Sequence, residues 1–273
     1  MESADRDIAY ASGVPQQAWR RNWVAFRTIV VKEIRRFTRI WAQTLLPSVI
    51  TTTLYLLIFG GLIGSRVGPM GGHDYMAFIV PGVIMLSVIT NSYGNVVASF
   101  FGAKFGGFVQ ELLVAPVPNW LILAGFVAGG MIRGLITAVL VSTVAFALTD
   151  FTVQHLGLTL LVAALTALMF SLAGFINAVF AQSFDDISII PTFVLTPLTY
   201  LGGVFYSIDL LPDFWRTLSL ANPVLYMVNA FRHGILGVSD VNPYVALGML
   251  GLFIALLGSV SLWLMHRGYG IKS

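Results

Sequence analysis

The chain alternates long apolar stretches with short polar ones, and the apolar stretches have the length of transmembrane helices. Six of them lie near residues 43–65, 77–100, 122–148, 157–181, 188–207 and 242–265. A helix needs about 20 mainly apolar residues to cross the hydrocarbon of a bilayer. The pattern therefore predicts an all-α membrane protein, with residues 42–273 forming one domain of six transmembrane helices.

The segment before the first span has a different pattern. Between residues 19 and 41 the apolar positions recur at gaps of three and four, and basic residues occupy the opposite face. This spacing is typical of an amphipathic helix, and such a helix lies in the membrane surface with its arginines on lipid phosphates. An amphipathic helix packed on a soluble domain is the alternative. The residues expected at the membrane surface are Trp19, Trp23, Phe26, Arg27 and Arg35. Residues 1–18 are expected to form an N-terminal tail.

The loop 103–119 is short and apolar, and it ends in Pro116 and Pro118. We expect a short helix from about Gly107 to Val114, because a helix rarely continues into the residue before a proline. With Lys104 and Glu111 as its only charges, this helix would be poorly solvated alone, which favours a protein partner. A helix that only anchors the second and third spans is the alternative.

The segment 209–236 is too long for a tight turn and too apolar for a solvated loop. Asn222-Pro223 divides it into two pieces of a length that suits re-entrant helices. The sequence predicts a re-entrant helical hairpin in the outer leaflet.

Composition excludes a soluble enzyme. Only 10% of the 273 residues are charged and 57% are hydrophobic, whereas soluble domains carry about 25% charged residues.

The basic residues predict the orientation in the membrane. Residues 1–41 hold eight of the 15 Lys and Arg residues. Since cytoplasmic loops carry the excess of basic residues, both termini are predicted to be cytoplasmic. We find no apolar core of a cleavable signal peptide.

Motifs for chemistry are missing from the sequence. No lysine follows a glycine, so the phosphate-binding motif G-x-x-x-x-G-K-[ST] cannot occur. The four histidines lie in separate segments without metal-ligand spacing, and there is no cysteine. We therefore predict no catalytic, cofactor-binding or metal-binding residue in this chain, and no nucleic-acid partner.

Polar side chains form stripes along three spans. They are expected either to line a path for a polar or amphipathic substrate or to form a subunit interface. The alternative is that they only join helices or bond to their own backbone. These residues are Thr44, Ser48, Thr52 and Tyr55 in the first span, Ser87, Asn91 and Asn95 in the second, and Thr192, Thr196 and Tyr200 in the fifth. In the third span, pairs of glycines four residues apart are expected to serve packing, and Arg133 is expected to reach toward the inner headgroups.

The chain resembles the membrane subunits of type-2 ATP-binding-cassette (ABC) exporters, and within them the YadH-like branch of small bacterial inner-membrane permeases. A basic amphipathic helix precedes six spans, as in that family. The loop Phe108 to Pro118 is similar to the family segment L-E-x-L-L-V-x-P-V. The stretch Pro197 to Tyr206, followed by Asn222-Pro223, is similar to the family signature.

The resemblance implies that residues 103–116 form a cytoplasmic coupling helix that docks on a separate ATPase subunit. The residues implied at this contact are Phe108, Gln110, Glu111, Leu112, Leu113, Phe184, Asp185 and Asp186. It further implies two copies of the permease and two ATPase subunits carrying ATP and Mg, in a bacterial inner membrane. A lipid, glycolipid, drug or polymer would move outward by alternating access. A self-sufficient secondary transporter or channel is the alternative, and it predicts inverted repeats or intramembrane acids, neither of which is visible.

Overall fold

The computed structural model describes residues 2–268 and 270, with side chains left out for residues 2–17 and 65. These residues are mostly helical and form no β-strand. Five helices are long and apolar enough to cross a membrane, so five of the six predicted spans are confirmed. The first joins α2 (Trp41–Thr44), α3 (Leu46–Tyr55) and the π-helical turn η1 (Leu56–Ile63), and the others are α5 (Tyr75–Phe105), α7 (Asn119–Leu148), α8 (Leu156–Phe180) and α13 (Pro243–Arg267).

The predicted span 188–207 is a shorter helix. It runs through three five-residue stretches, α9 (Asp186–Ile190), the π-helical η2 (Pro191–Leu195) and α10 (Thr196–Tyr200). At about 1.5 Å per residue it is only about 22 Å long, less than a bilayer's hydrocarbon core of about 30 Å. It stops at Tyr200 because the chain turns through Gly203, whose φ of +68° suits only glycine well.

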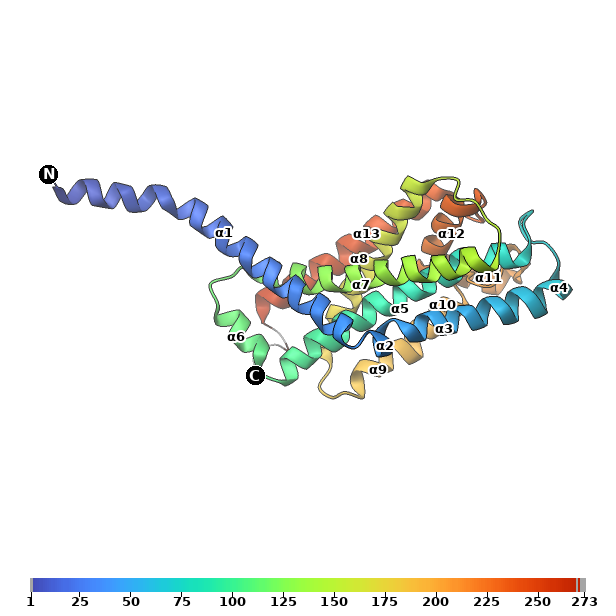
Figure 1. Cartoon of the computed structure of the whole chain (residues 1–273), viewed down its shortest axis with the longest axis horizontal. Helices are drawn as coiled ribbons and strands as arrows, with labels where there is room; N and C mark the ends of the chain where they lie inside the picture. The colour runs from blue at the N-terminus through green and yellow to red at the C-terminus, as the bar shows by residue number, and fades with distance from the viewer. Residues whose placement is uncertain (1, 269, 271–273) are drawn as a thin grey trace.

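The second span, α5, lies at the centre of the molecule between α7 and α8 (Figure 1). Close packing here depends on glycine. A Cβ on Gly130 or Gly134 of α7 would collide with Ser92 of α5, and one on Gly174 of α8 would collide with the carbonyl of Tyr93. The packing role predicted for the glycine pairs of the third span is therefore confirmed.

The N-terminal helix α1 (Glu2–Arg39) begins before residue 19, the start expected from the sequence. Its C-terminal half packs against α7 (Figure 1), where Gly125 and Gly129 let Ile29 and Glu33 approach closely. The predicted tail comprises residues 1–18, and the structure describes no side chain before residue 18.

The two helical arms predicted on either side of Asn222-Pro223 are present as α11 (Asp213–Leu220) and α12 (Pro223–Leu236), and their re-entrant position in the outer leaflet stays a prediction. Asn222 separates them, and its side chain accepts a hydrogen bond from the Val224 amide at the start of α12. While α11 is largely exposed, α12 is buried against α5, α8 and α13. The second arm therefore lies in the protein core, where it is shielded from lipid.

Burial of α12 carries one arginine into the core. Arg232 lies in the segment 209–236, which the sequence predicted as an outer-leaflet hairpin, and its side chain is fully buried. Its guanidinium lies 4.0 Å from the Phe78 ring centre, donates to the Gly203 carbonyl at 2.6 Å, and is 3.8 Å from the Asp240 carboxylate. These contacts fasten α12 to the turn that follows α10.

The two remaining short helices are α4 (Gly64–Val67), which ends the first span, and α6 (Phe108–Val114). The short helix predicted from about Gly107 to Val114 is thus present as α6. A single 3-10 turn, η3 (Ile208–Leu210), precedes the hairpin.

Candidate functional site

A groove of about 700 Å³ runs between the first span, α5 and the helix 186–200. It brings together three stretches that are far apart in the sequence. Seven of the ten residues predicted for a path or subunit interface line it, namely Ser48, Thr52, Tyr55, Ser87, Thr192, Thr196 and Tyr200.

The groove contains many hydroxyl groups and no charged side chain. Of its 22 lining residues, 12 carry a hydroxyl group and none carries a formal charge. Aromatic rings gather where Phe205 enters the groove. The Phe205 ring centre lies 4.9 Å from that of Phe59 and 5.3 Å from that of Tyr55, and the Tyr75 hydroxyl donates to the Phe205 carbonyl at 2.9 Å. Packed aromatic side chains therefore form this end of the groove.

The other three predicted residues, Thr44, Asn91 and Asn95, are buried and do not line the groove. Asn95 accepts a hydrogen bond from Arg36 of α1 at 2.9 Å. Asn91 accepts one from Arg133 of α7 at 3.2 Å, and Arg133 also donates to the Thr44 carbonyl at 3.0 Å. These two amides hold helices together. The sequence suggested that Arg133 reaches toward the headgroups, but its guanidinium bonds to neighbouring helices instead.

Glu33 is a site residue that the sequence analysis missed. Its side chain is fully buried between α1, α5 and α7. Ser99 donates a hydrogen bond to it, and Arg36 lies 3.2 Å and Lys32 3.4 Å from its carboxylate. Its position gave a signal, because residue 33 falls on the apolar stripe of α1 between Val30 and Phe37, where a carboxylate needs partners.

The predicted docking residues gather at one end of the molecule. On α6, Phe108, Gln110 and Glu111 are exposed, while Leu112 and Leu113 pack partly against the core. Phe184 reaches the same region, since its ring lies 5.0 Å from Phe101 and 5.2 Å from Phe105, just before α6. An exposed aromatic surface therefore joins α6 to the turn before α9.

The two acids of that turn differ in environment. Asp185 is exposed, and its carboxylate accepts no hydrogen bond from the described residues. Asp186 accepts hydrogen bonds from the backbone amides of Gln182 and Ser183, at 2.9 and 3.0 Å. These bonds lower the pKa of the Asp186 carboxyl below its ordinary value of 3.8. Asp186 therefore shapes the turn, and Asp185 remains available to a partner.

Four of the five residues predicted for the membrane surface, Trp19, Trp23, Arg27 and Arg35, are exposed on α1, and Phe26 is half-buried. A hollow of about 520 Å³ lies along the face that carries Trp23, Arg27 and Arg35. Large exposed apolar rings beside arginines are what an interfacial helix presents to lipid.

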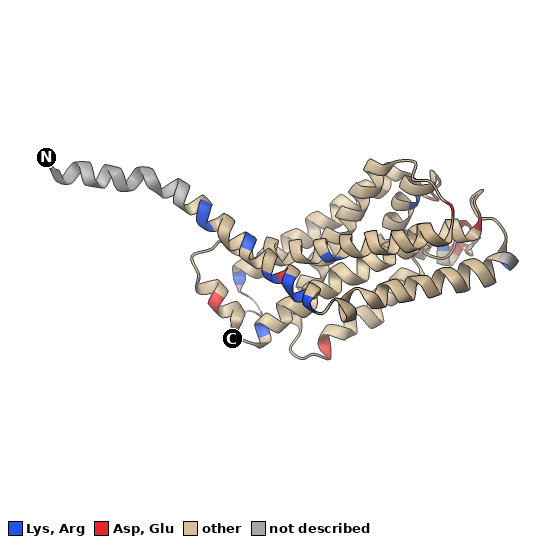
Figure 2. Cartoon of the chain, in the orientation of Figure 1, with Lys and Arg blue, Asp and Glu red and all other residues tan. Residues whose placement is uncertain are grey.

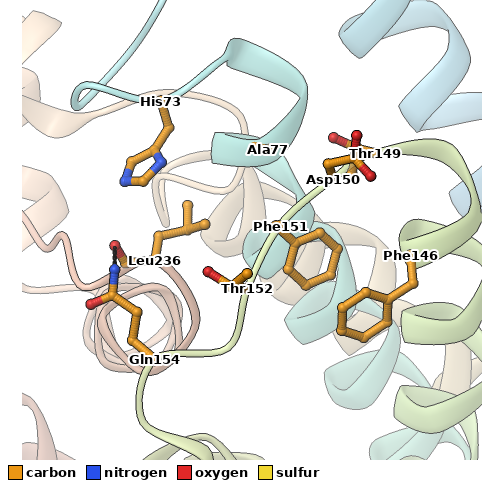
Figure 3. A pocket seen from close by; sticks show the side chains of 9 residues that line it. All are labelled: His73, Ala77, Phe146, Thr149, Asp150, Phe151, Thr152, Gln154 and Leu236. Carbon is orange, nitrogen blue, oxygen red and sulfur yellow. Dashed lines mark hydrogen bonds between the residues drawn. The ribbon is translucent and has the colours of Figure 1, made fainter.

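A second hollow, of about 350 Å³, lies at the far end of α7 from α6. Figure 3 shows His73, Asp150 and Gln154 around it, with Phe146 and Phe151 stacked on one side. The Gln154 amide donates to the Leu236 carbonyl at 3.1 Å and so joins the start of α8 to the end of α12. No sequence pattern predicted this hollow.

Residues 24–236, which contain α6, the groove and the hairpin, match the family model described as ABC-2 type transporter. The chain belongs to the ABC-2 type transporter family. It is 56% identical over 251 residues to the inner membrane transport permease YadH of Escherichia coli (strain K12), covering 92% of this chain and 98% of that protein. It is 26% identical over 250 residues to nodulation protein J of Rhizobium leguminosarum bv. trifolii, covering 91% of each.

Family membership identifies the chain as a permease subunit of an ABC transporter, which works in a membrane together with an ATPase subunit. The resemblance stated from the loop at 108–118 and the stretch at 197–206 is thereby confirmed. Nodulation protein J of Rhizobium meliloti (strain 1021) is a further relative, 24% identical over 263 residues, with 94% of this chain and 97% of that protein covered.

Proposed function

We propose that this permease is the membrane-spanning subunit of an ATP-driven exporter of the bacterial inner membrane. It moves an amphipathic or polar substrate outward through the groove between the first span, α5 and the helix 186–200. The groove carries this proposal, because a hydroxyl-lined, uncharged channel wall suits a substrate that must be bound and then released. The name of the Escherichia coli relative supports the location.

The end with α6 is the cytoplasmic end. Figure 2 shows that the described Lys and Arg residues gather on the part of the molecule that holds α1 and α6. Excess basic residues mark the cytoplasmic side of a membrane protein. Both termini then lie in the cytoplasm, and the surface formed by α6 and Phe184 faces the ATPase subunit.

Two copies of the permease work together with two ATPase subunits. The groove is open along one side in a single chain, so a second copy facing it would complete a closed path between the two. ATP and Mg are held by the ATPase subunits. Their closure pushes α6, which is joined directly to α5 through Gly106 and Gly107, and rocks the helices that border the groove.

The docking surface is tested by reversing one charge. Glu111→Lys, on the exposed face of α6, should lower the amount of ATPase subunit that co-purifies with the permease by about tenfold, the size expected when a charge contact at an interface is reversed. Asp213→Lys, an equivalent change on α11 at the other end, is the matched control and should have no effect. Equal retention of the ATPase subunit by both variants would contradict the docking surface.

A further inference from the structure

The C-terminal end of α8 is held by a lysine from another helix. The ammonium of Lys104, in the last turn of α5, donates to the backbone carbonyls of Val179 and Ala181 at 2.6 and 2.8 Å. The end of a helix leaves its last carbonyls without a donor of their own and carries a partial negative charge. An ammonium group has three hydrogens and can satisfy both carbonyls at once. Lys104 therefore ties the end of α5 to the end of α8.

The Val179 carbonyl is open to this lysine because Asp186 binds the amide that would otherwise reach it. If α8 continued, the Ser183 amide would bond to the Val179 carbonyl, four residues earlier. Ser183 instead donates to the Asp186 carboxylate at 3.0 Å, and the Gln182 amide donates to the same carboxylate at 2.9 Å. The course of the turn before α9, residues 181–185, is therefore set by an acid on one side and by a lysine on the other.

Lys104 also lies close to α6 along the chain. Three residues separate it from the start of α6, and the last of them, Gly107, donates its amide to the Lys104 carbonyl at 3.1 Å. Val109 of α6 is buried in the same apolar cluster as Val179 and Ala181. The base of α6 and the end of α8 therefore form one packed unit, to which Lys104 contributes the hydrogen bonds between α5 and α8.

We propose that Lys104 is a positioning residue, which holds the turn before α9 in a fixed place relative to α6 so that both segments meet the ATPase subunit together. This inference rests on the proposed function, because it takes α6 and the turn as the docking surface. It adds the residue that joins the two halves of that surface. A surface whose parts are already held in place loses less conformational entropy on binding than one whose parts must first be ordered.

Hydrogen exchange of the full-length permease in lipid nanodiscs tests whether Lys104 holds the turn. Lys104→Met nearly keeps the side-chain length and removes both hydrogen bonds. We expect the amides of residues 181–183 to exchange about tenfold faster, because a hydrogen bond to a charged group contributes about that factor or more. Lys104→Arg keeps a cation with several donors and should restore slow exchange. Gln154→Met is the matched control, because Gln154 ties the opposite end of α8 to the Leu236 carbonyl at 3.1 Å, and it should leave the turn unchanged.

Titration of the ATPase subunit into nanodiscs that hold the permease tests whether the position of the turn matters for docking. Lys104→Met should raise the concentration of ATPase subunit at half-maximal permease-stimulated ATP hydrolysis about 3- to 10-fold, which corresponds to immobilising one side chain at an interface. The maximal activity should stay nearly unchanged. A variant that only destabilised the permease would instead lower the maximal activity, through loss of folded protein, and leave the half-maximal concentration as it is. Lys104→Arg should restore the wild-type value.

Asp186→Asn separates the effect of position from that of charge. Lys104→Met makes the docking region more negative, whereas Asp186→Asn makes it less negative. If only the electrostatic field at the surface mattered, the two variants would shift the half-maximal concentration in opposite directions. Because each of them releases the turn, we expect both to raise it.

The outcomes separate this proposal from the proposed function. Wild-type exchange of the turn in Lys104→Met, an unchanged half-maximal concentration, or opposite shifts in Lys104→Met and Asp186→Asn would each overturn the role of Lys104. If Glu111→Lys weakens the complex at the same time, the docking surface stands without that role. A raised half-maximal concentration in Lys104→Met, in a complex that Glu111→Lys fails to weaken, would support the role of Lys104 and count against the contact at Glu111.

Discussion

At the scale of single residues, Glu33 shows how a carboxylate can be kept in an apolar setting. Its charge is balanced by Arg36, whose guanidinium also bonds to the side chain and carbonyl of Asn95. Asn95 and Ser99 are on α5 and Glu33 is on α1, so Glu33 and Arg36 fix α1 against α5 about three helical turns before the chain reaches α6. We therefore expect a motion of α6 to reach α1 through α5.

Replacing Glu33 tests this link. Glu33→Gln leaves Arg36 without its counter-charge and should cost about 1–3 kcal/mol of stability, the cost of unsatisfied buried polar groups. For a chain of this size each kcal/mol lowers the melting temperature by about 2–4 °C, which thermal unfolding of the detergent-solubilised permease can measure. Glu111→Gln, at an exposed site, is the control. Equal melting temperatures for the two variants would contradict the role of Glu33.

Asp185 and Asp186 are adjacent acids with different expected roles. Since the pKa of Asp186 is lower in the folded protein than in the unfolded chain, its stabilisation of the turn is present above pH 3.8 and is lost as pH falls through the lowered value. At neutral pH, Asp186→Asn should speed hydrogen exchange of the Gln182 and Ser183 amides several-fold, and Asp185→Asn should not. Similar exchange in both variants would mean that the carboxylate does not order the turn.

At the scale of elements, α1 depends on two glycines of α7. A Cβ at Gly129 would come within 2.6 Å of the Glu33 Cβ, and one at Gly125 within 2.6 Å of Ile29. The two helices can therefore lie this close only if α7 has no side chain at these positions. The contact places the Glu33 carboxylate beside α5.

Gly129→Val should push α1 off α7 and destabilise the permease by about 1–3 kcal/mol, as overpacking does. Gly102→Val is the control, because a Cβ at Gly102 of α5 meets nothing within 4 Å. Melting temperature and co-purification of the ATPase subunit measure the effect together. If Gly102→Val were the more damaging of the two, the packing account of α1 would be wrong.

The elements were predictable to different degrees. Span lengths follow from the thickness of the bilayer, so five spans, α6 and the two arms of the hairpin could be placed from apolar runs and prolines alone. The helix 186–200 was predicted too long because apolar composition continues beyond Tyr200, whereas the turn depends on Gly203. Burial of α12 was missed because it arises from contacts with α5, α8 and α13, which no local pattern encodes.

At the scale of the whole molecule, the spacing of polar residues in the sequence identified the polar face of each span but not the helix that each face contacts. Ser, Thr and Tyr residues of the three predicted spans do meet around the groove, where Thr52 and Ser87 bond to each other and Thr196 bonds to its own backbone. Amides have more bonding groups, and Asn91 and Asn95 are accordingly drawn into contacts with Arg133 and Arg36. A sequence stripe could not distinguish these two outcomes, since both produce the same spacing.

The central claim is that nucleotide turnover on a separate subunit changes the exposure of the groove. The chain has no cysteine, so Thr196→Cys gives a single thiol inside the groove. Its rate of reaction with a membrane-impermeant maleimide can be followed in proteoliposomes. The rate should change when ATP and vanadate are added, and only when the ATPase subunit is present. The account would be contradicted if the reaction rate in the complex did not change on addition of ATP. It would also be contradicted if the rate for the permease alone changed in response to an ion gradient across the membrane.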